Sequence, residues 1–316
     1  MWASLVLGWG LCQAEPVRDF SFFLNRLMSV NHLPVLEEAE TKMFSTWNAS
    51  GENGDGRWFD NTVNDYTNVL LDVEGPGCVH QILTGLRDPF DNYRTRIQIF
   101  VDGSDVPVID EAMSKFLDLN NGLFPSPLTV ECFPGVMVPI PFKEHIKIQL
   151  FDPDGVVLKY TTENGRTAVV SEPGKPAPFK SKWGSFWQII YQKYPVDTPV
   201  QSFRWPLSSA EQELVDRLAA DWAYAQSNPP ERVLKPCDEM LFSLKAGESK
   251  SFEFSGPCMF DLVKCSLKDA TPEQMLKLRL QMFWDGESYP SVDVPVGFFF
   301  GNGPYAYEHS YNGRLI

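Results

Sequence analysis

Positive charge is scarce in this sequence. Its 316 residues include 27 Lys and Arg against 41 Asp and Glu, which gives a net charge of −14 and an isoelectric point near 4.8. Nucleic acids and anionic membrane surfaces attract proteins through clustered Lys and Arg. The composition therefore argues against a nucleic-acid partner and against binding to an anionic membrane surface. With 43% apolar and 22% charged residues, the chain is expected to be globular.

Motifs for metals, cofactors and common nucleophiles are also missing. The sequence has no C-x-x-C pair, phosphate loop, dinucleotide fingerprint, G-x-S-x-G elbow or H-E-x-x-H, and its four His are scattered. We therefore expect no metal and no cofactor. The segment Asp152-Pro153-Asp154-Gly155 follows a predicted strand and lacks the further oxygen ligands of a calcium loop, which favours a turn.

The N-terminal segment has no charge and is mostly apolar. Met1–Ala14 is too short to span a bilayer, and Cys12 and Ala14 stand at −3 and −1 before Glu15, where signal peptidase accepts small residues. We interpret residues 1–14 as a signal peptide of a secreted protein. The alternative is a start site placed slightly wrong, because the segment has no basic residue. Five Cys would remain in the mature chain, an odd number, and buried small hydrophobes are the favoured interpretation for most of them.

Two stretches of the sequence resemble each other. Gly75-Pro76 recurs as Gly256-Pro257, at an offset of 256 − 75 = 181 residues. Asp102-Gly103 recurs as Asp285-Gly286, at an offset of 285 − 102 = 183. Because both pairs recur in order, with alternating apolar residues between them, we infer an internal repeat.

Short strands bounded by turns account for most of the chain. They are predicted at Val69–Val73, Arg96–Phe100, Val136–Ile140, His145–Leu150 and Phe186–Tyr194, and in the second copy at Phe252–Phe254 and Leu278–Phe283. Almost no helix separates these strands, which indicates antiparallel sandwiches and favours the jelly roll. The predicted fold is all-β, with tandem jelly-roll β-sandwiches.

Two helices frame the first sandwich. Val17–Met28 has amphipathic spacing, and Leu207–Gln226 begins with a capping box at Ser208 or Ser209 and ends before Pro229-Pro230. The predicted divisions are a signal peptide (1–14), an N-terminal helix and aromatic/Gly loop (15–57), a first jelly roll (58–206), a helix and Pro-rich linker (207–236), and the first part of a second jelly roll (237–316).

The second copy is shorter than the first. Only 316 − 293 = 23 residues follow Asp293, whereas the first copy continues for about 93 residues beyond Asp110. A half-built sandwich would expose unpaired edges. We therefore expect the second sandwich to be incomplete and the sequence to be the front portion of a longer protein. The alternative is a smaller second domain that closes by itself.

Aromatic and short polar residues gather in the segment Phe44–Asp60. Aromatic faces stack on sugar rings while polar side chains bind hydroxyls, so we predict that Trp47, Asn53, Asp55 and Trp58 bind a carbohydrate. The alternative is an ordinary surface loop. Two further features are a glycosylation sequon at Asn48, whose occupancy is left open, and a pair of carboxylates, Asp72 and Glu74, which is interpreted as a solvated strand end.

These motifs resemble a known family. Trp47–Asp55 (WNASGENGD) is similar to the S-S-Y-D-R-x-G-G-N-x-D segment of domain-of-unknown-function family 2961, which is grouped with glycoside hydrolase family 172. Further matching segments, in the family's order, are Val73–Gly77, Val101–Gly103 with Pro107, Pro139–Phe142, Trp187–Tyr194, Trp284–Gly286 and Pro290–Gly301. The resemblance covers Phe20 to about Tyr307. The sequence departs from the family at Asn48-Ala49, where the family has Asp-Arg, and at Phe298, where it has Asp.

The resemblance implies two tandem jelly rolls that assemble as trimers or hexamers. It also implies cleavage of fructofuranosides or arabinofuranosides with retention, which needs two carboxyl groups about 5 Å apart. The family's glutamates lie in G-E-G-D and G-T-G-T-E-D-Y motifs, and neither occurs in this sequence. They would follow the matched P-S-V segment, beyond or close to Ile316. No catalytic residue is therefore assigned. Two hypotheses remain: the N-terminal part of a secreted furanosidase, or a non-catalytic sandwich protein that binds glycans or forms assemblies.

Overall fold

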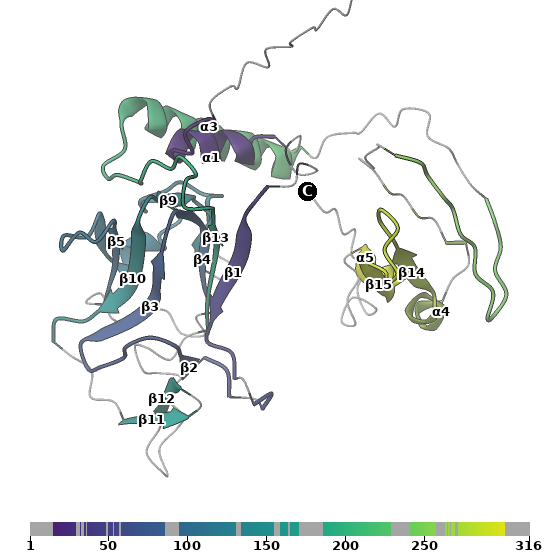
Figure 1. Cartoon of the computed structure of the whole chain (residues 1–316), viewed down its shortest axis with the longest axis horizontal. Coiled ribbons are helices and arrows are strands. Elements are labelled where there is room, and N and C mark those ends of the chain that lie inside the picture. The colour runs from purple at the N-terminus through teal and green to yellow at the C-terminus, as the bar shows by residue number, and fades with distance from the viewer. Residues whose placement is uncertain are drawn as a thin grey trace, which may run out of the picture. The chain divides into compact units, whose positions relative to one another are not determined.

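The computed structural model divides the chain into two compact units, Met1–Met240 and Leu241–Ile316 (Figure 1). It describes residues 15–29, 32, 35, 37–48, 50–52, 54–56, 58–85, 95–130, 134–154, 159–163, 165–170, 186–228, 241–256, 263, 265, 267–268 and 271–300. The predicted signal peptide and most of the predicted linker lie outside these residues. In the described part, no helix combines the length and the apolar character needed to cross a membrane.

The first unit consists of antiparallel sheets. In the six-stranded sheet the order is β1 (Glu40–Ser45), β13 (Phe186–Lys193), β4 (Gly77–Gly85), β8 (Gly135–Val136) and β7 (Thr129–Val130), and β9 (Ile140–Phe142) also pairs with β4. The four-stranded sheet has the order β3 (Thr67–Glu74), β10 (His145–Phe151), β5 (Arg96–Val101) and β6 (Ile109–Ala112). A third sheet has the order β11 (Lys159–Glu163), β12 (Arg166–Val170) and β2 (Trp58–Phe59). The chain passes from one large sheet to the other at β3–β4–β5 and β9–β10–β13, and the all-β sandwich prediction is confirmed.

The core lies between the two larger sheets because their strands alternate in polarity. In β10, Ile146, Ile148 and Leu150 are fully buried, whereas the intervening residues are only partly buried. The facing sheet contributes Ile82 and Trp187, which are also buried. Apolar burial of this kind is the main favourable term in folding. The alternating pattern that predicted these strands therefore also determines which face of each strand lies inside.

Two helices pack together beside the sandwich (Figure 1). They are α1 (Phe20–Leu27) and α3 (Ser209–Ser227). In α3 the Ser208 hydroxyl accepts from the backbone of Glu211 and the Glu211 carboxylate accepts from the backbone of Ser208, so the predicted capping box is present. The apolar side chains Leu214, Leu218 and Trp222 of α3 face the core, with Leu218 fully buried.

The second unit repeats one element of the first. Its hairpin of β14 (Arg279–Met282) and β15 (Val292–Pro295) has the same register as β5 and β6 at a constant offset of 279 − 96 = 183 residues. The short helices that follow, α2 (Met113–Phe116) and α5 (Val296–Phe299), have the same offset. Both Asp-Gly turns also have positive φ values, 54° and 69° at Asp102-Gly103 and 44° and 79° at Asp285-Gly286. The internal repeat inferred from the sequence is therefore a structural one in this region.

The same ion pair closes the two hairpins. Arg96 bonds to the carboxylate and backbone oxygen of Asp110, and Arg279 bonds to those of Asp293 at 2.8 and 2.9 Å. The side-chain hydrogen bond from Arg279 lowers the pKa of Asp293. Because each Arg contacts both the side chain and the backbone of its partner, it holds a particular register.

Two local predictions were wrong, and one helix was missed. Phe252–Phe254 forms no strand, because no neighbouring strand among the described residues pairs with it, and an alternating sequence alone does not hold a strand in water. The predicted strand Val136–Ile140 is split into the ends of β8 and β9. A short helix, α4 (Pro272–Lys277), precedes β14, and it was not predicted although Thr271 and Gln274 form its capping box.

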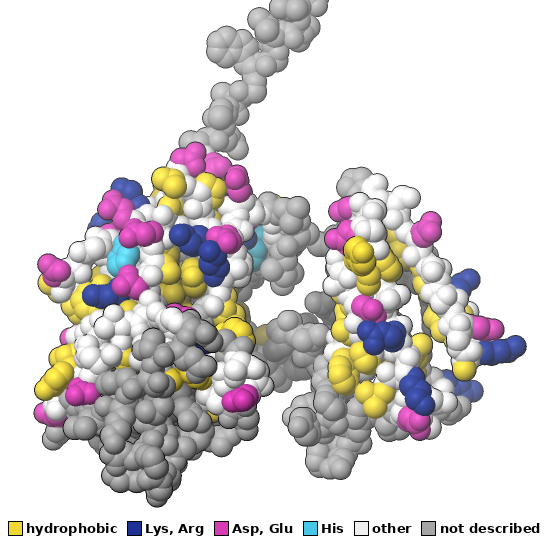
Figure 2. All heavy atoms as spheres, turned by 60° about the horizontal axis from the view of Figure 1, so that its bottom comes forward, with side chains coloured by type: hydrophobic (Ala, Val, Ile, Leu, Met, Phe, Trp, Pro, Cys, Tyr) yellow, Lys and Arg dark blue, Asp and Glu magenta, His cyan; other side chains and the backbone are white. Residues whose placement is uncertain are grey.

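The structure also leaves large apolar side chains of the second unit at its surface (Figure 2).

A half-buried histidine lies where α1 packs on the six-stranded sheet. His80 of β4 lies 2.9 Å from the Gln192 side-chain oxygen and packs edge-on against the Phe23 ring. Burial lowers the pKa of His80, the Arg26 charge lowers it further, and the bond to Gln192 opposes both. The folded state therefore prefers the neutral imidazole.

We expect the first unit to lose stability as the pH falls from 7 through the unfolded-state pKa of histidine, near 6.5. The unfolded chain then binds a proton at His80 that the folded chain does not, so the free energy of unfolding decreases. Denaturant titrations at several pH values should show a shallower loss for His80→Gln. Burial also lowers the pKa of His32, so His32→Gln should be measured in parallel. An unchanged slope in His80→Gln would contradict this assignment.

Candidate functional site

The aromatic loop between β1 and β2 is closed at its base. The backbone N–H of Gly56 donates to the Thr46 oxygen at 2.8 Å, and the Thr46 hydroxyl accepts from the Trp187 N–H at 2.9 Å. Gly56 has a φ of +88°, and a Cβ there would lie 3.3 Å from the Phe186 ring. A glycine is therefore required at this position. These contacts anchor the base of the loop to the core strand β13.

Hydrogen bonds inside the loop fix its turn. The Asn48 N–H donates to the Asp55 carboxylate at 2.6 Å, and the Asn48 side-chain oxygen accepts from the Ser50 N–H and hydroxyl at 3.1 and 2.9 Å. Asn48 is only 7% exposed, and a Cβ on Gly54 would lie 2.9 Å from its Nδ2. The sequon residues and one oxygen of Asp55 therefore hold the loop together. Glycosylation of Asn48 stays a prediction.

Arg166 of β12 joins the two ends of the loop. Its guanidinium donates to the Asp60 carboxylate at 2.5 Å and to the backbone oxygens of Trp47, Ser45 and Trp58 at 2.6, 2.9 and 3.3 Å. The Arg166 side chain is 12% exposed, and its carbon centre lies 5.9 Å from the middle of the Trp47 ring. Four acceptors thus surround the fixed fork of donors on one guanidinium. Arg166 thus fixes the backbone conformation at both Trp47 and Trp58.

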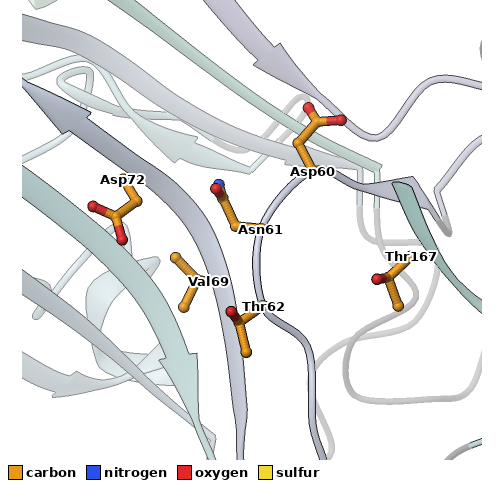
Figure 3. Close-up of a pocket in the computed structure, with 6 residues that line it drawn as sticks. All are labelled: Asp60, Asn61, Thr62, Val69, Asp72 and Thr167. Carbon is orange, nitrogen blue, oxygen red and sulfur yellow. The ribbon is translucent and has the colours of Figure 1, made fainter. Parts of the chain in front are cut away.

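A shallow hollow of about 390 Å³ lies next to this anchor (Figure 3). The residues that line it come from the β2–β3 connection, β3 and β12: Asp60, Asn61, Thr62, Val69, Asp72 and Thr167. In Figure 3, Asn61 lies between the two carboxylates. Its amide donates to the Leu70 backbone oxygen at 3.2 Å, which holds the connection against β3. The hollow therefore presents mainly oxygen atoms on a fixed backbone.

Asp72 lies on the outer face of the four-stranded sheet. Its carboxylate is 2.6 Å from Nε2 of His145, which comes from the neighbouring strand β10. The Asp72 side chain is 44% exposed and the His145 side chain 23% exposed. The interpretation of Asp72 as a solvated strand end therefore leaves out two features, its contact with His145 and its place in the hollow. Among the described residues, no group of three or more His, Cys, Asp or Glu is arranged to hold a metal ion.

The four predicted sugar-binding residues differ in exposure, and one of them is not described. The Trp47 ring is 55% exposed, Asp55 is exposed and Trp58 is half-buried in β2. Asn53 lies outside the described residues. Sequence reasoning missed Arg166, which is separated from Asp60 by 106 residues and reaches it only because β12 pairs with β2. No local motif marks Arg166, so no signal in the sequence could have identified it.

The comparisons with known proteins identify the family. The family model described as the GH172 first beta-sandwich domain matches residues 37–211. This match spans more than half of the chain, from just before β1 to the start of α3, and includes the loop, Arg166 and the hollow. The protein therefore belongs to glycoside hydrolase family 172, as the motifs indicated. The search of curated proteins gave no match.

Replacing Arg166 with Met should loosen the aromatic loop. The change removes a nearly buried charged donor and leaves four acceptors without it, so we expect the free energy of unfolding to fall by about 2 kcal/mol. Limited proteolysis should then cut between residues 46 and 58 faster than in the wild type. The matched control is Arg204→Met, because Arg204 is exposed. Equal stability and equal cleavage in the two variants would contradict the role given to Arg166.

Proposed function

We propose that this protein is a secreted glycan-binding member of its family that acts on fructofuranosides or arabinofuranosides. The observation that carries this proposal is the exposed Trp47 ring, held on a fixed backbone by Arg166, which also bonds to Asp60 at the edge of the hollow. Sugar rings need such a pairing, since their C–H faces stack on aromatic rings while their hydroxyls bind polar groups.

The lining of the hollow supports a neutral, hydroxyl-rich ligand. Asp60 and Asp72 supply carboxylate acceptors, and Asn61, Thr62 and Thr167 supply amide and hydroxyl groups. The Asp60 carboxylate already contacts the Arg166 guanidinium, and the Asp72 carboxylate contacts His145 Nε2; their remaining acceptor positions suit hydroxyl donors. The volume of the hollow lies near the lower end of the range for ligand sites. It therefore suits one sugar ring better than a long oligosaccharide.

We propose that the complete enzyme uses the retaining two-carboxylate mechanism implied by the family resemblance. That mechanism needs one carboxylate as nucleophile and a second group as acid and base, about 5 Å apart. Neither of the family's glutamate motifs occurs in the 316 residues, so we place the catalytic glutamates outside them. In this proposal, Asp60 and Asp72 bind the sugar and do not cleave it.

A second candidate function is non-catalytic glycan binding within an assembly. The missing glutamate motifs favour it, and the binding loop is equally compatible with it. Turnover of fructofuranosides and arabinofuranosides by the protein in its native secreted form separates the two candidates. Hydrolysis with retention supports the enzyme, whereas tight glycan binding without hydrolysis supports the second candidate. Assembly into trimers or hexamers is proposed for either case from the family resemblance.

Secretion predicts a defined mature N-terminus. If residues 1–14 are a signal peptide, the secreted protein should begin at Glu15, which intact mass and N-terminal sequencing will show. Glycosidase treatment of the same sample tests Asn48, and Asn48→Gln is the matched control. A protein that retains Met1 after expression in a secretory host would contradict the secretion proposal.

Replacing Trp47 with Ala should weaken glycan binding more than it lowers stability. Loss of one aromatic face is worth about 1 kcal/mol beyond buried area, so the dissociation constant for a furanoside oligosaccharide should rise roughly five- to tenfold. The ring is half exposed, so the change in stability should be small. Isothermal titration calorimetry with fructofuranosyl and arabinofuranosyl oligosaccharides measures the effect. The control is Tyr224→Ala on α3, another exposed aromatic, and unchanged binding in Trp47→Ala would remove the loop from the site.

A further inference from the structure

A second exposed aromatic residue lies on the segment that lines the hollow. Asp60, Asn61 and Thr62 line the hollow, and the same β2–β3 connection continues to Tyr66. Tyr66 is 54% exposed, almost the same fraction as Trp47 at 55%. In the part of the chain that the structure describes, no other aromatic ring contacts the Tyr66 ring, and its hydroxyl has no hydrogen-bond partner. The ring is therefore available to a ligand.

The segment before Tyr66 runs antiparallel to β3. The Val69 N–H donates to the Thr62 backbone oxygen at 2.9 Å, and Val63 and Asn68 form an antiparallel bridge. These contacts place the two sides of the connection next to each other, with a turn between them. One wall of the hollow and Tyr66 thus belong to one hairpin, and Tyr66 lies at its tip.

Hydrogen bonds fix the turn at the tip of this hairpin. The Asn64 N–H donates to the Thr67 backbone oxygen at 2.8 Å, and the Asn64 side-chain oxygen accepts from the N–H groups of Tyr66 and Thr67 at 2.9 and 2.8 Å. The Asp152 N–H donates to the Tyr66 backbone oxygen at 2.9 Å, which ties the tip to the residue that follows β10. The backbone of Tyr66 is therefore ordered before any ligand binds, which lowers the entropic cost of binding at its ring.

The hairpin also sets the distance between Tyr66 and the hollow. An antiparallel strand rises about 3.4 Å per residue, so about 7 Å separates Thr62 from the start of the turn that carries Tyr66. At the other end of the lining segment, Arg166 donates to the Asp60 carboxylate and to the Trp47 backbone oxygen. The lining segment thus has an exposed aromatic residue beyond each of its ends. Because Tyr66 does not itself line the hollow, its position suits a neighbouring sugar unit rather than the one in the hollow.

We propose that Tyr66 forms a second sugar subsite outside the hollow, where its ring stacks on the unit next to the one that the hollow binds. This inference rests on the proposed glycan binding and specifies the ligand as a neutral oligosaccharide. The hollow alone suits one ring, so a monosaccharide bound there leaves Tyr66 uncovered. The C–H face of the next unit stacks on the aromatic ring, and its hydroxyls bond to the phenol group. Tyr66 therefore determines specificity for chain length.

Titrations with ligands of increasing length test the second subsite. Isothermal titration calorimetry on the secreted protein should show tighter binding of the trisaccharide than of the monosaccharide, for fructofuranosyl or arabinofuranosyl ligands. Tyr66→Ala should remove this gain. The dissociation constant for the trisaccharide should rise roughly five- to tenfold, as expected for one aromatic face, while that for the monosaccharide stays the same. Tyr66→Phe keeps the ring and should retain most of the gain.

Two further variants and a second readout locate the effect. Tyr224→Ala removes an exposed aromatic residue of α3 and should leave every titration unchanged. Trp47→Ala should weaken binding of the monosaccharide as well, because Trp47 belongs to the proposed site at the hollow. Hydrogen exchange of the wild type needs no variant. At equal saturation, the amides of residues 62–69 should be protected more by the trisaccharide than by the monosaccharide.

The outcomes separate the second subsite from the proposed function. If the wild type binds both ligands equally well, or if Tyr66→Ala affects both ligands to the same extent or neither, the second subsite is wrong and the glycan-binding proposal stands. Binding by Tyr66→Phe that is as weak as in Tyr66→Ala would overturn the stacking role. If the wild type binds no saccharide, both proposals are wrong.

Discussion

The pairing of β10 on both of its edges is the constraint on which most of this structure depends. Its inner residues fill the sandwich core, and its hydrogen bonds join β3 to β5. Its outer residues place His145 beside Asp72, so the strand that completes the core also contacts a carboxylate that lines the hollow. Because each backbone group of a strand needs a partner, a sheet with such a central strand has little freedom in register.

The candidate site depends on a second long-range contact, that of Arg166 with the aromatic loop. A loop of glycines and short polar residues has many conformations in the unfolded chain, and ordering it is entropically costly. One guanidinium with four acceptors, together with the Thr46 and Asn48 hydrogen bonds, offsets that cost at the base and the middle of the loop. The Trp47 ring takes no hydrogen bond in this network; the Arg166 guanidinium lies 5.9 Å from its centre, and Trp47 stays 55% exposed. An exposed aromatic on an ordered backbone is a surface that loses little entropy when a ligand binds.

The sequence was informative wherever structure depends on local spacing. Alternating residues predicted β5 and β10, strand-like runs bounded by turns predicted β3 and β13, and a capping box predicted the start of α3. Trp47 could be identified as a candidate because aromatic and short polar residues are neighbours in the loop. Arg166 and the hollow could not be identified, because strand pairing brings them together from positions about a hundred residues apart. Phe252–Phe254 shows the converse, since this strand-like sequence has no paired neighbour among the described residues and is not a strand.

The two copies of the hairpin distinguish the contacts made within the hairpin from those made with its neighbours. Arg, Gln and Asp recur at matching positions, as do the Asp-Gly turn and the short helix, although the apolar residues between them differ. The hairpin therefore keeps its register through its own contacts, with or without a second neighbouring strand among the described residues. The burial of its apolar residues, in contrast, depends on that neighbour, because Phe100 and Phe283 have the same place in the hairpin and very different exposure.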